Sequence, residues 1–263
     1  ALTDELRSEL PFALTRSQES SLEEILSDMA GPAPMLRLLQ GDVGCGKTVV
    51  AAMALLAAVG AGHQGAFMAP TEVLATQHHR VLTDLLSQMG DPPKVALLTG
   101  STKTAERAQI LEELNAGKIG IIVGTHALIH EKVVFNSLGI SVVDEQHRFG
   151  VEQRAALLSK GKLPPHMLTM SATPIPRTLA MTKFGEMALS VIDEKPAGRL
   201  PIITTVCSAD DHSVAYDAMC EEVARGGQAY VILRLVNESG SSRMSEVKGA
   251  EEEYARLVSE YPN

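Results

Sequence analysis

A glycine-rich stretch, GDVGCGKT at residues 41–48, constrains the fold of this chain more than any other feature. Its spacing, a glycine, four residues and then Gly-Lys-Thr, is typical of a phosphate-binding loop. An apolar run at residues 35–39 precedes the stretch, and an alanine-rich helical pattern follows it. A strand that turns into a helix here directs backbone N–H groups and the positive end of the helix at one phosphate group. The stretch therefore predicts an α/β fold with a nucleotide site after its first strand.

Each residue type in this phosphate loop has a role in that chemistry. Glycines let the backbone curl around phosphate oxygens. Lys47 is placed to reach the β- and γ-phosphates, and the hydroxyl of Thr48 to bind Mg²⁺. The alternative, a turn that binds nothing, does not explain the strand, loop and helix in this order. The predicted nucleotide-binding residues of the loop are Gly41, Asp42, Val43, Gly44, Cys45, Gly46, Lys47 and Thr48.

Gln18 lies upstream of the loop, in a helix predicted over residues 15–30 from its apolar periodicity. Thr15 and Gln18 have the spacing of a capping box, in which the Gln18 amide satisfies the backbone N–H of Thr15. The same amide, with a donor and an acceptor, could instead recognise the edge of an adenine base. The spacing alone leaves both interpretations open.

Short apolar runs alternate with helical stretches over most of the chain, the pattern of a parallel sheet covered by helices on both faces. In such sheets ligands bind outside the carboxyl ends of the strands. The residues that follow each strand are therefore the candidates for a site. The predicted strands are residues 35–40, 65–69, 95–99, 119–124, 140–144, 167–171 and 188–192.

Two acidic residues stand at the end of one of these strands. Asp144 closes the apolar segment that begins at residue 140, and Glu145 follows it. A carboxylate at this place suits a Mg²⁺ ligand, and its neighbour suits a base for an attacking water. The alternative is the acidic first turn of a helix. With the phosphate loop present, the metal and base interpretation is favoured.

Composition bounds the class of protein. The chain has 263 residues, of which 45% are hydrophobic, and no apolar run is long enough to span a membrane, so we expect a globular protein. Its three cysteines are an odd number without the spacing of a metal site, and we therefore expect the reducing cytoplasm. The net charge of −9 argues against broad nucleic-acid binding, so any such site must be local. Neither the Leu-Ser-Gly-Gly-Gln motif of transporter ATPases nor the Asn-Lys-x-Asp motif of GTPases occurs.

An ordered set of further motifs carries a family resemblance. The segments LTRSQ, GDVGCGKT, APTEVLATQH, LLTGS, VGTHALI, VVDEQHRFGVEQR and SATPIPRTL occur in this order between residues 10 and 201. In this form the set resembles the first RecA-like motor domain of superfamily 2 helicases with a DEQH box, above all the branch-migration helicases of bacteria. The translocase of transcription-coupled repair is the alternative within the class.

The resemblance implies an ATP-dependent DNA helicase that uses Mg²⁺ and acts on forked or branched DNA in repair and recombination. It implies that Gln18 reads adenine, that Thr48 and Asp144 hold Mg²⁺, and that Lys47, Asp144, Glu145 and His147 are catalytic. The family usually has serine where this chain has Cys45, and we expect the cysteine to be tolerated because the position contributes its backbone N–H. The residues implied in DNA binding or coupling are Thr71, Gly100, Ser101, Thr125, His126, Arg148, Arg154, Ser171, Thr173 and Arg177.

Without the resemblance, most of that last group has a simpler interpretation. Thr71 and its equivalents after other strands would be ordinary helix caps. Ser171 and Thr173 would close a strand, and His147 would be a partly exposed histidine. The three arginines suit either phosphate contacts or ion pairs that close two domains on each other.

The remaining residues predict a second, incomplete RecA-like domain. We expect the first domain over residues 1–195, a linker over 196–201, and the partial domain over 202–263, with strands at 202–206 and 228–233 and helices at 211–225 and 250–261. No arginine finger in a His-x-x-Gly-Arg-x-Gly-Arg context and no wedge domain for splitting a junction are present, so we expect a piece of a longer protein. The isolated chain should bind ATP and turn it over slowly. A nucleotide-dependent binding module without motor activity is the alternative of a different class.

Overall fold

The computed structural model describes residues 1–145, 151–161, 163–173, 187–194, 202–208, 212–232 and 250–260. The chain divides into two compact units, Ala1–Arg199 and Leu200–Asn263. Among the described residues, no helix is both long and apolar enough to cross a membrane.

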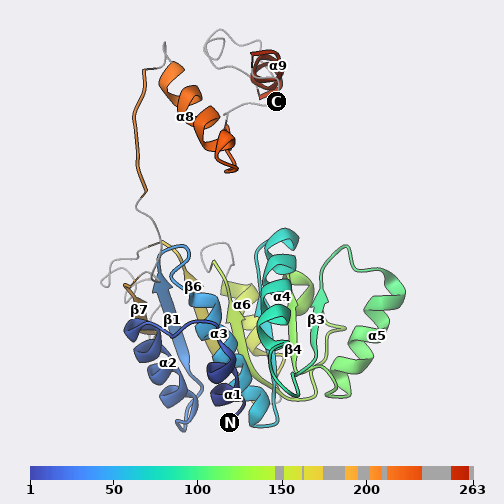
Figure 1. Ribbon diagram of the computed structural model, residues 1–263. Coiled ribbons are helices and arrows are strands. Elements are labelled where there is room, and N and C mark those ends of the chain that lie inside the picture. Colours follow the sequence, from blue (N-terminus) through green and yellow to red (C-terminus); the bar gives the residue numbers. More distant parts are fainter. Residues whose placement is uncertain are drawn as a thin grey trace. The chain divides into compact units, whose positions relative to one another are not determined.

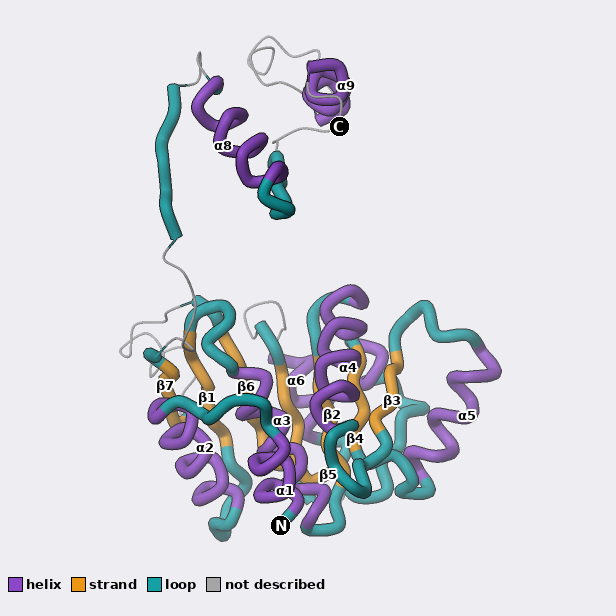
Figure 2. The backbone as a smooth tube through the Cα atoms, viewed as in Figure 1, coloured by secondary structure: helices purple, strands orange, loops and turns teal. Residues whose placement is uncertain are grey.

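The first unit is built on a seven-stranded sheet with the order β3-β4-β2-β5-β6-β1-β7 (Figures 1 and 2). Every neighbouring pair of strands is parallel. The seven strands predicted in this unit are confirmed, with ends that differ by at most two residues. The strands are β1 (Leu36–Gly41), β2 (Gln64–Met68), β3 (Val95–Leu98), β4 (Ile121–Gly124), β5 (Leu138–Val143), β6 (His166–Ser171) and β7 (Ala188–Ile192).

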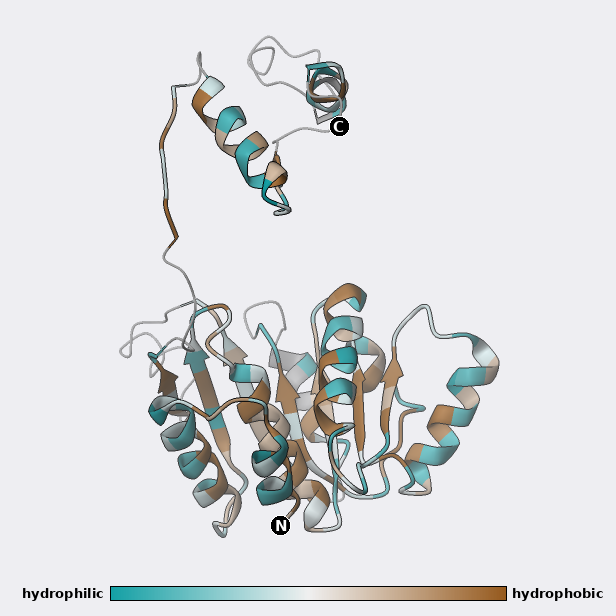
Figure 3. Cartoon of the chain, in the orientation of Figure 1, coloured by the Kyte–Doolittle hydropathy of each residue, from teal (hydrophilic) through white to brown (hydrophobic). Residues whose placement is uncertain are grey.

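Helices cover both faces of this sheet, as predicted. Successive residues of a strand point to opposite faces, and in β2 the side chain of Phe67 joins one apolar cluster while Ala66 and Met68 join the other. All three are fully buried. In Figure 3 the strands are coloured mainly hydrophobic, whereas outer helices such as α2 and α5 carry hydrophilic residues. The two-sided burial explains why the strands read as continuous apolar runs rather than alternating ones.

The helices of this unit follow the strands in the expected places. The helix predicted over residues 15–30 is confirmed, whereas the first helix was not predicted from the sequence. The helices are α1 (Leu2–Glu9), α2 (Arg16–Met29), α3 (Lys47–Gly60), α4 (Glu72–Leu86), α5 (Thr104–Asn115), α6 (Val151–Leu158) and the short 3-10 helix η1 (His126–Ile129).

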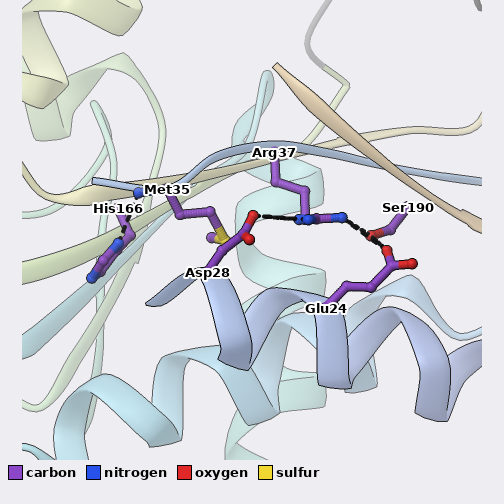
Figure 4. Close-up of polar contacts among 6 residues, drawn as sticks. All are labelled: Glu24, Asp28, Met35, Arg37, His166 and Ser190. Atoms are coloured by element: carbon purple, nitrogen blue, oxygen red, sulfur yellow. Dashed lines mark hydrogen bonds and ion pairs between the residues drawn. The ribbon is translucent and has the colours of Figure 1, made fainter. Parts of the chain in front are cut away.

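A buried arginine joins α2 to the edge of the sheet (Figure 4). Arg37 of β1 is 8% exposed. Its guanidinium lies 2.8 Å from the carboxylate of Glu24 and 2.8 Å from that of Asp28, one turn apart on α2. It also donates to the hydroxyl of Ser190 in β7 at 2.7 Å, and that hydroxyl donates to Glu24. One side chain therefore fixes α2 against both β1 and β7.

We expect Arg37→Ala to lower the free energy of unfolding of this chain by about 3 kcal/mol, the low end of the range for breaking a buried ion pair. The low end applies because Glu24 and Asp28 are 46% and 36% exposed and can regain water. Urea unfolding followed by circular dichroism measures the loss. Arg7→Ala is the control, because it removes an exposed pair with Glu19 and should cost less than about 1 kcal/mol. Equal losses of unfolding free energy in the two variants would contradict the role of Arg37 as a buried ion-pair residue.

A histidine is the first residue of β6, the strand that pairs with β1 on the side opposite β7. His166, the first residue of β6, accepts a hydrogen bond at Nδ1 from the backbone N–H of Met35 at 3.0 Å (Figure 4). Burial lowers the pKa of His166, and the nearby His63 acts in the same direction. The hydrogen bond accepted at Nδ1 requires the proton of the ring on Nε2, and the lowered pKa favours this neutral form.

The second unit contains the two predicted helices, which are α8 (Ser213–Ala224) and α9 (Ala250–Glu260). They are joined by Glu253, which is 2% exposed and accepts hydrogen bonds from Tyr216 of α8 and from Arg256. The guanidinium of Arg256 also lies 4.7 Å from the centre of the Tyr216 ring.

The two strands predicted in this unit are wrong for the residues that the structure describes. Residues 202–208 and 227–232 have no strand structure, and residue 233 lies outside the described part. Ile203 and Ile232 are 90% and 91% exposed. A strand needs the backbone hydrogen bonds of a neighbour, and β-branched composition alone does not provide them.

Candidate functional site

The carboxyl ends of the parallel strands meet along one edge of the sheet, where the arrowheads point in Figure 1. The phosphate loop follows β1, Ser171 ends β6 and Asp144 follows β5. These three strands are neighbours in the order β5-β6-β1. The fold therefore brings together residues that lie far apart in the sequence.

The phosphate loop has the backbone conformation that its glycines allow. Gly44 and Gly46 have φ of 77° and 90°, in the left-handed region that favours glycine. Gly46 is the N-cap of α3, so Lys47 and Thr48 lie in the first turn of that helix. A Cβ atom at Gly46 would overlap the amide nitrogen of Gln18. The backbone angle of this position therefore requires glycine, and a larger residue would also displace the Gln18 amide.

Lys47 lies over the loop from which it extends. Its ammonium donates to the carbonyl oxygen of Gly41 at 2.6 Å and to that of Asp42 at 3.0 Å. The side chain of Asp42 accepts from the N–H of Val43 at 2.8 Å, which orders the turn. The positive charge of Lys47 and the N-terminus of α3 lie at the same place, as phosphate binding requires.

Gln18 serves both the helix and the loop. Its Oε1 accepts from the backbone N–H of Thr15 at 2.8 Å, so the predicted capping box is present. Its Nε2 donates to the carbonyl oxygen of Cys45 at 2.7 Å. Gln18 is 2% exposed and Cys45 is 1% exposed. The capping interpretation is thus confirmed, and the same amide also links α2 to the phosphate loop, while adenine recognition stays a prediction.

The carboxylate of Asp144 is held at both oxygens. Its Oδ1 accepts from the backbone N–H of Glu145 at 3.0 Å. Its Oδ2 lies 2.7 Å from Nε2 of His78 in α4. Asp144 is 8% exposed. Asp144 and Glu145 lie in a bend after β5, and residues 146–150 lie outside the described part, so the helix-start alternative is not tested.

Glu145 has an unusual backbone. Its φ of 51° is the one positive value recorded for a residue other than glycine in the described ranges. Such a conformation costs of order 1–3 kcal/mol and occurs preferentially at functional sites. The strain coincides with the residue that the sequence predicts to act on water.

Sequence reasoning missed His78. Its partner Asp144 is 66 residues away, so no local pattern links the two. One signal was available, because His78 lies on the buried stripe of α4 with Ala75 and Leu82, both of which are 0% exposed. A histidine on an apolar helix face needs a polar partner, and here that partner is the predicted metal ligand.

The residues predicted to line a DNA track lie after β2, β3 and β4. Thr71 caps α4 by accepting from Leu74 N–H at 3.3 Å, and Thr125 caps η1 through the N–H of Ala127 at 3.5 Å. Thr125 is 2% exposed, whereas His126 is exposed. The capping interpretation is confirmed for both threonines, and their DNA contacts stay predictions.

An acidic side chain occupies the neighbouring turn. The carboxylate of Glu72 accepts from the N–H of Ser101 at 3.1 Å and from its hydroxyl at 2.6 Å, and it lies beside Gly100. The hydrogen bond from the Ser101 hydroxyl holds the pKa of Glu72 below its usual range. Glu72 thus binds the groups that were expected to contact a phosphate.

Ser171 and Thr173 contact each other at the end of β6. Ser171 is 1% exposed, its Oγ lies 3.0 Å from Oγ1 of Thr173, and it accepts from the N–H of Thr173 at 3.3 Å. His147, Arg148 and Arg177 lie outside the described residues. Arg154 lies in α6, but its side chain is also outside the described part.

The donor set fits Mg²⁺ bound together with a nucleotide. Among the described residues no group of three or more His, Cys, Asp or Glu side chains could hold a metal alone. Mg²⁺ commonly takes only one or two carboxylates and completes its shell with phosphates and water. Asp144 offers a fixed carboxylate and Thr48 a hydroxyl, so the residues present suit this mode of binding.

Comparisons with known proteins agree with this geometry. Residues 15–182 match the DEAD/DEAH box helicase family. The ATP-dependent DNA helicase RecG of Synechocystis sp. (strain ATCC 27184 / PCC 6803 / Kazusa) is 51% identical over 97% of this chain and 30% of the relative. That of Bacillus subtilis (strain 168) is 53% identical over 88% of this chain and 33% of the relative. The chain spans about a third of the length of these relatives.

Solved structures also show similarity to RecG and to the DEAD box fold. The structure of RecG bound to a three-way DNA junction has a TM-score of 0.80 at 41% identity, over 98% of this chain and 33% of that chain. A DEAD box protein from the hyperthermophile Methanococcus jannaschii has a TM-score of 0.53 at 20% identity, over 73% of this chain and 53% of that chain, which shows the fold alone. These similarities confirm the predicted RecA-like fold and the resemblance to RecG, an ATP-dependent DNA helicase.

Proposed function

Because this chain belongs to the DEAD/DEAH box helicase family, we propose that it is the ATP-binding motor unit of an ATP-dependent DNA helicase for forked or branched DNA. One observation carries the proposal. The phosphate loop after β1 and the Asp144-Glu145 pair after β5 flank a single strand, β6, at one edge of the sheet. A nucleotide-hydrolysing site needs these two parts on opposite sides of the γ-phosphate.

In the proposed reaction each residue has one task. The loop N–H groups and Lys47 bind and orient the phosphates of ATP. Thr48 and Asp144 would hold Mg²⁺, which neutralises phosphate charge when it is bound. Glu145 would accept a proton from the attacking water. Gln18 would present its amide to adenine in exchange for its partners in this structure, the N–H of Thr15 and the carbonyl oxygen of Cys45. His147 would be one of the catalytic residues.

The choice of branched DNA rests on the relatives. The two relatives described above are named ATP-dependent DNA helicases, and a structure of RecG was solved on a three-way DNA junction. In this chain Thr71, Ser101 and Thr125 follow β2, β3 and β4, so DNA-facing loops would lie along the half of the edge away from the phosphate loop. Hydroxyl and backbone contacts there would bind phosphates without reading sequence.

Coupling to movement would use the remaining residues. Ser171 and Thr173, next to the nucleotide site, would transmit its state, and Arg148, Arg154 and Arg177 would contact phosphates or close the domains. Leu200–Asn263 would be part of a second RecA-like domain. Closure of two such domains on ATP and their reopening after hydrolysis would convert turnover into steps along DNA. The isolated chain would bind ATP and hydrolyse it slowly.

The cysteines support the proposed location in the cytoplasm. Cys45, Cys207 and Cys220 are all free thiols. Free thiols are usual in a reducing compartment.

The test is ATP hydrolysis by the full-length protein with forked DNA, plain duplex, single-stranded DNA and RNA. The proposal predicts the strongest stimulation by forked DNA. Stimulation mainly by plain duplex would favour a translocase of transcription-coupled repair. Tight ATP binding with no stimulation by any nucleic acid would leave a binding module without motor activity.

Glu72→Gln should strengthen the binding of forked DNA by up to about fivefold, the size of one exposed charge interaction. The substitution removes a negative charge from the proposed phosphate path and weakens its hold on the N–H and hydroxyl of Ser101. Fluorescence anisotropy at fixed ionic strength measures the change. Asp84→Asn is the control, since it removes an exposed carboxylate from the last turn of the same helix. Weaker binding by the Glu72 variant, or equal effects of both, would contradict the proposed track.

A further inference from the structure

His78 has a structural setting unlike that of a surface histidine. Its side chain is 12% exposed. The centre of its ring lies 4.5 Å from the centre of the Phe67 ring, and the two ring planes are inclined at 40° to each other. Phe67 is a fully buried residue of β2. Packing on one side and the hydrogen bond to Asp144 on the other leave the ring little freedom to rotate. The imidazole is therefore a rigid support rather than a mobile group.

The chemistry of the contact sets its direction. An ionised carboxylate can only accept hydrogen bonds, so Nε2 of His78 must carry the proton and donate to Oδ2 of Asp144. The N–H of Glu145 donates to Oδ1. With one donor on each oxygen, the plane of the carboxylate is fixed, and the remaining lone pairs have defined directions. A metal ligand that is oriented in this way binds more tightly than one that rotates freely.

We propose that His78 is a positioning residue for the metal site, which orients the carboxylate of Asp144 for Mg²⁺ bound with the nucleotide. The proposal rests on the proposed function, since it needs Asp144 to be a metal ligand. His78 itself contacts neither metal nor nucleotide in this assignment. It acts through Asp144, and it ties the metal site to α4, the helix that begins at Thr71 and Glu72.

The test measures metal binding directly rather than turnover. The full-length protein is titrated with Mn²⁺, as a paramagnetic substitute for Mg²⁺, in the presence of a non-hydrolysable ATP analogue, and bound metal is followed by electron paramagnetic resonance. His78→Phe keeps a ring against Phe67 but removes the donor. His78→Gln restores an N–H donor at similar reach. His79→Phe is the matched control, because the adjacent His79 has no side-chain hydrogen bond to any residue in the described ranges.

We expect His78→Phe to raise the dissociation constant of Mn²⁺ by roughly tenfold or more, as is usual for loss of a group that orients a metal ligand. His78→Gln should recover most of the affinity, and His79→Phe should match the wild type. Thermal unfolding checks that each variant is folded. If His78→Phe does not fold, His78→Asn, whose amide is too short to reach Asp144, replaces it.

Two results would overturn the proposal. One is unchanged Mn²⁺ affinity in a folded His78→Phe protein. The other is an equal loss of Mn²⁺ affinity in His78→Phe and His78→Gln, which would show that the shape of the imidazole matters rather than its N–H donor. Failure of the proposed function looks different. In that case the wild type itself would bind no Mn²⁺ with the nucleotide analogue, or Lys47→Ala would bind the analogue as well as the wild type.

Discussion

Lys47→Ala should reduce ATP hydrolysis by the full-length protein by roughly 10²–10³-fold, the usual cost of removing one preorganised donor from a developing negative charge. The Lys47 ammonium is held over the phosphate loop by the carbonyl oxygens of Gly41 and Asp42. Alanine keeps the first turn of α3 but removes the positive charge from that place. Binding should weaken as well, because the charge contacts phosphates in both the ground state and the transition state. A steady-state assay with forked DNA gives the rate, and a fluorescent ATP analogue gives the affinity.

Lys94→Ala is the control for general effects of losing a lysine. Lys94 makes an ion pair with Glu113 in which its side chain is 50% exposed, away from the carboxyl edge of the strands. We expect this variant to hydrolyse ATP at the wild-type rate. A Lys47→Ala protein that retained more than about a tenth of the wild-type rate would show that the loop is not the catalytic phosphate site.

The fold of the first unit could be predicted from sequence because its inner strands, such as β2, β4, β5 and β6, are buried on both faces. In β2 the consecutive residues Ala66, Phe67 and Met68 are all fully buried, so the run of apolar residues is itself the signal. The phosphate loop then fixes which end of the sheet binds ligands. Strand order, in contrast, depends on how several helices pack together, and no local pattern encodes it.

The second unit shows where the same reasoning fails. Residues 202–206 and 228–232 have strand-like composition, yet the structure describes them as unpaired, exposed segments. Strand formation depends on a neighbour in space, whereas α8 and α9 satisfy their backbone groups within a single segment. This difference explains why the helices of this unit were predicted correctly and its strands were not.

Contacts between residues far apart in the chain could also not be predicted from the sequence. Glu72 and Ser101 are 29 residues apart. The family resemblance implied that Ser101 contacts DNA, but the sequence did not indicate the carboxylate that binds it. Arg37 reads as an interruption in an apolar strand, and only the packing of α2 shows that Glu24 and Asp28 surround it. In both cases one polar group is visible in the sequence and its partner is supplied by the fold.

Glu145→Gln should lower the rate of ATP hydrolysis by about 10²–10⁴-fold while leaving ATP binding intact, because a positioned general base contributes a factor of this size. Glutamine has nearly the same shape as glutamate, but it cannot accept the proton of the attacking water. The backbone N–H that donates to Asp144 is retained, so the metal ligand keeps its orientation. The φ of 51° at this residue is equally strained with either side chain, so stability should not change. The rate is measured in the DNA-stimulated steady state, and affinity with the fluorescent ATP analogue.

The contrast with Lys47→Ala makes the prediction specific. Loss of the lysine should weaken both binding and turnover, whereas loss of the glutamate should affect turnover alone, since it acts only when the water attacks. Glu106→Gln, which changes an exposed carboxylate of α5, controls for the change in net charge. A Glu145→Gln protein with a nearly normal rate would remove Glu145 as the base. A variant that no longer bound ATP would show instead that the carboxylate shapes the site, and that the strained backbone at residue 145 serves binding rather than proton transfer.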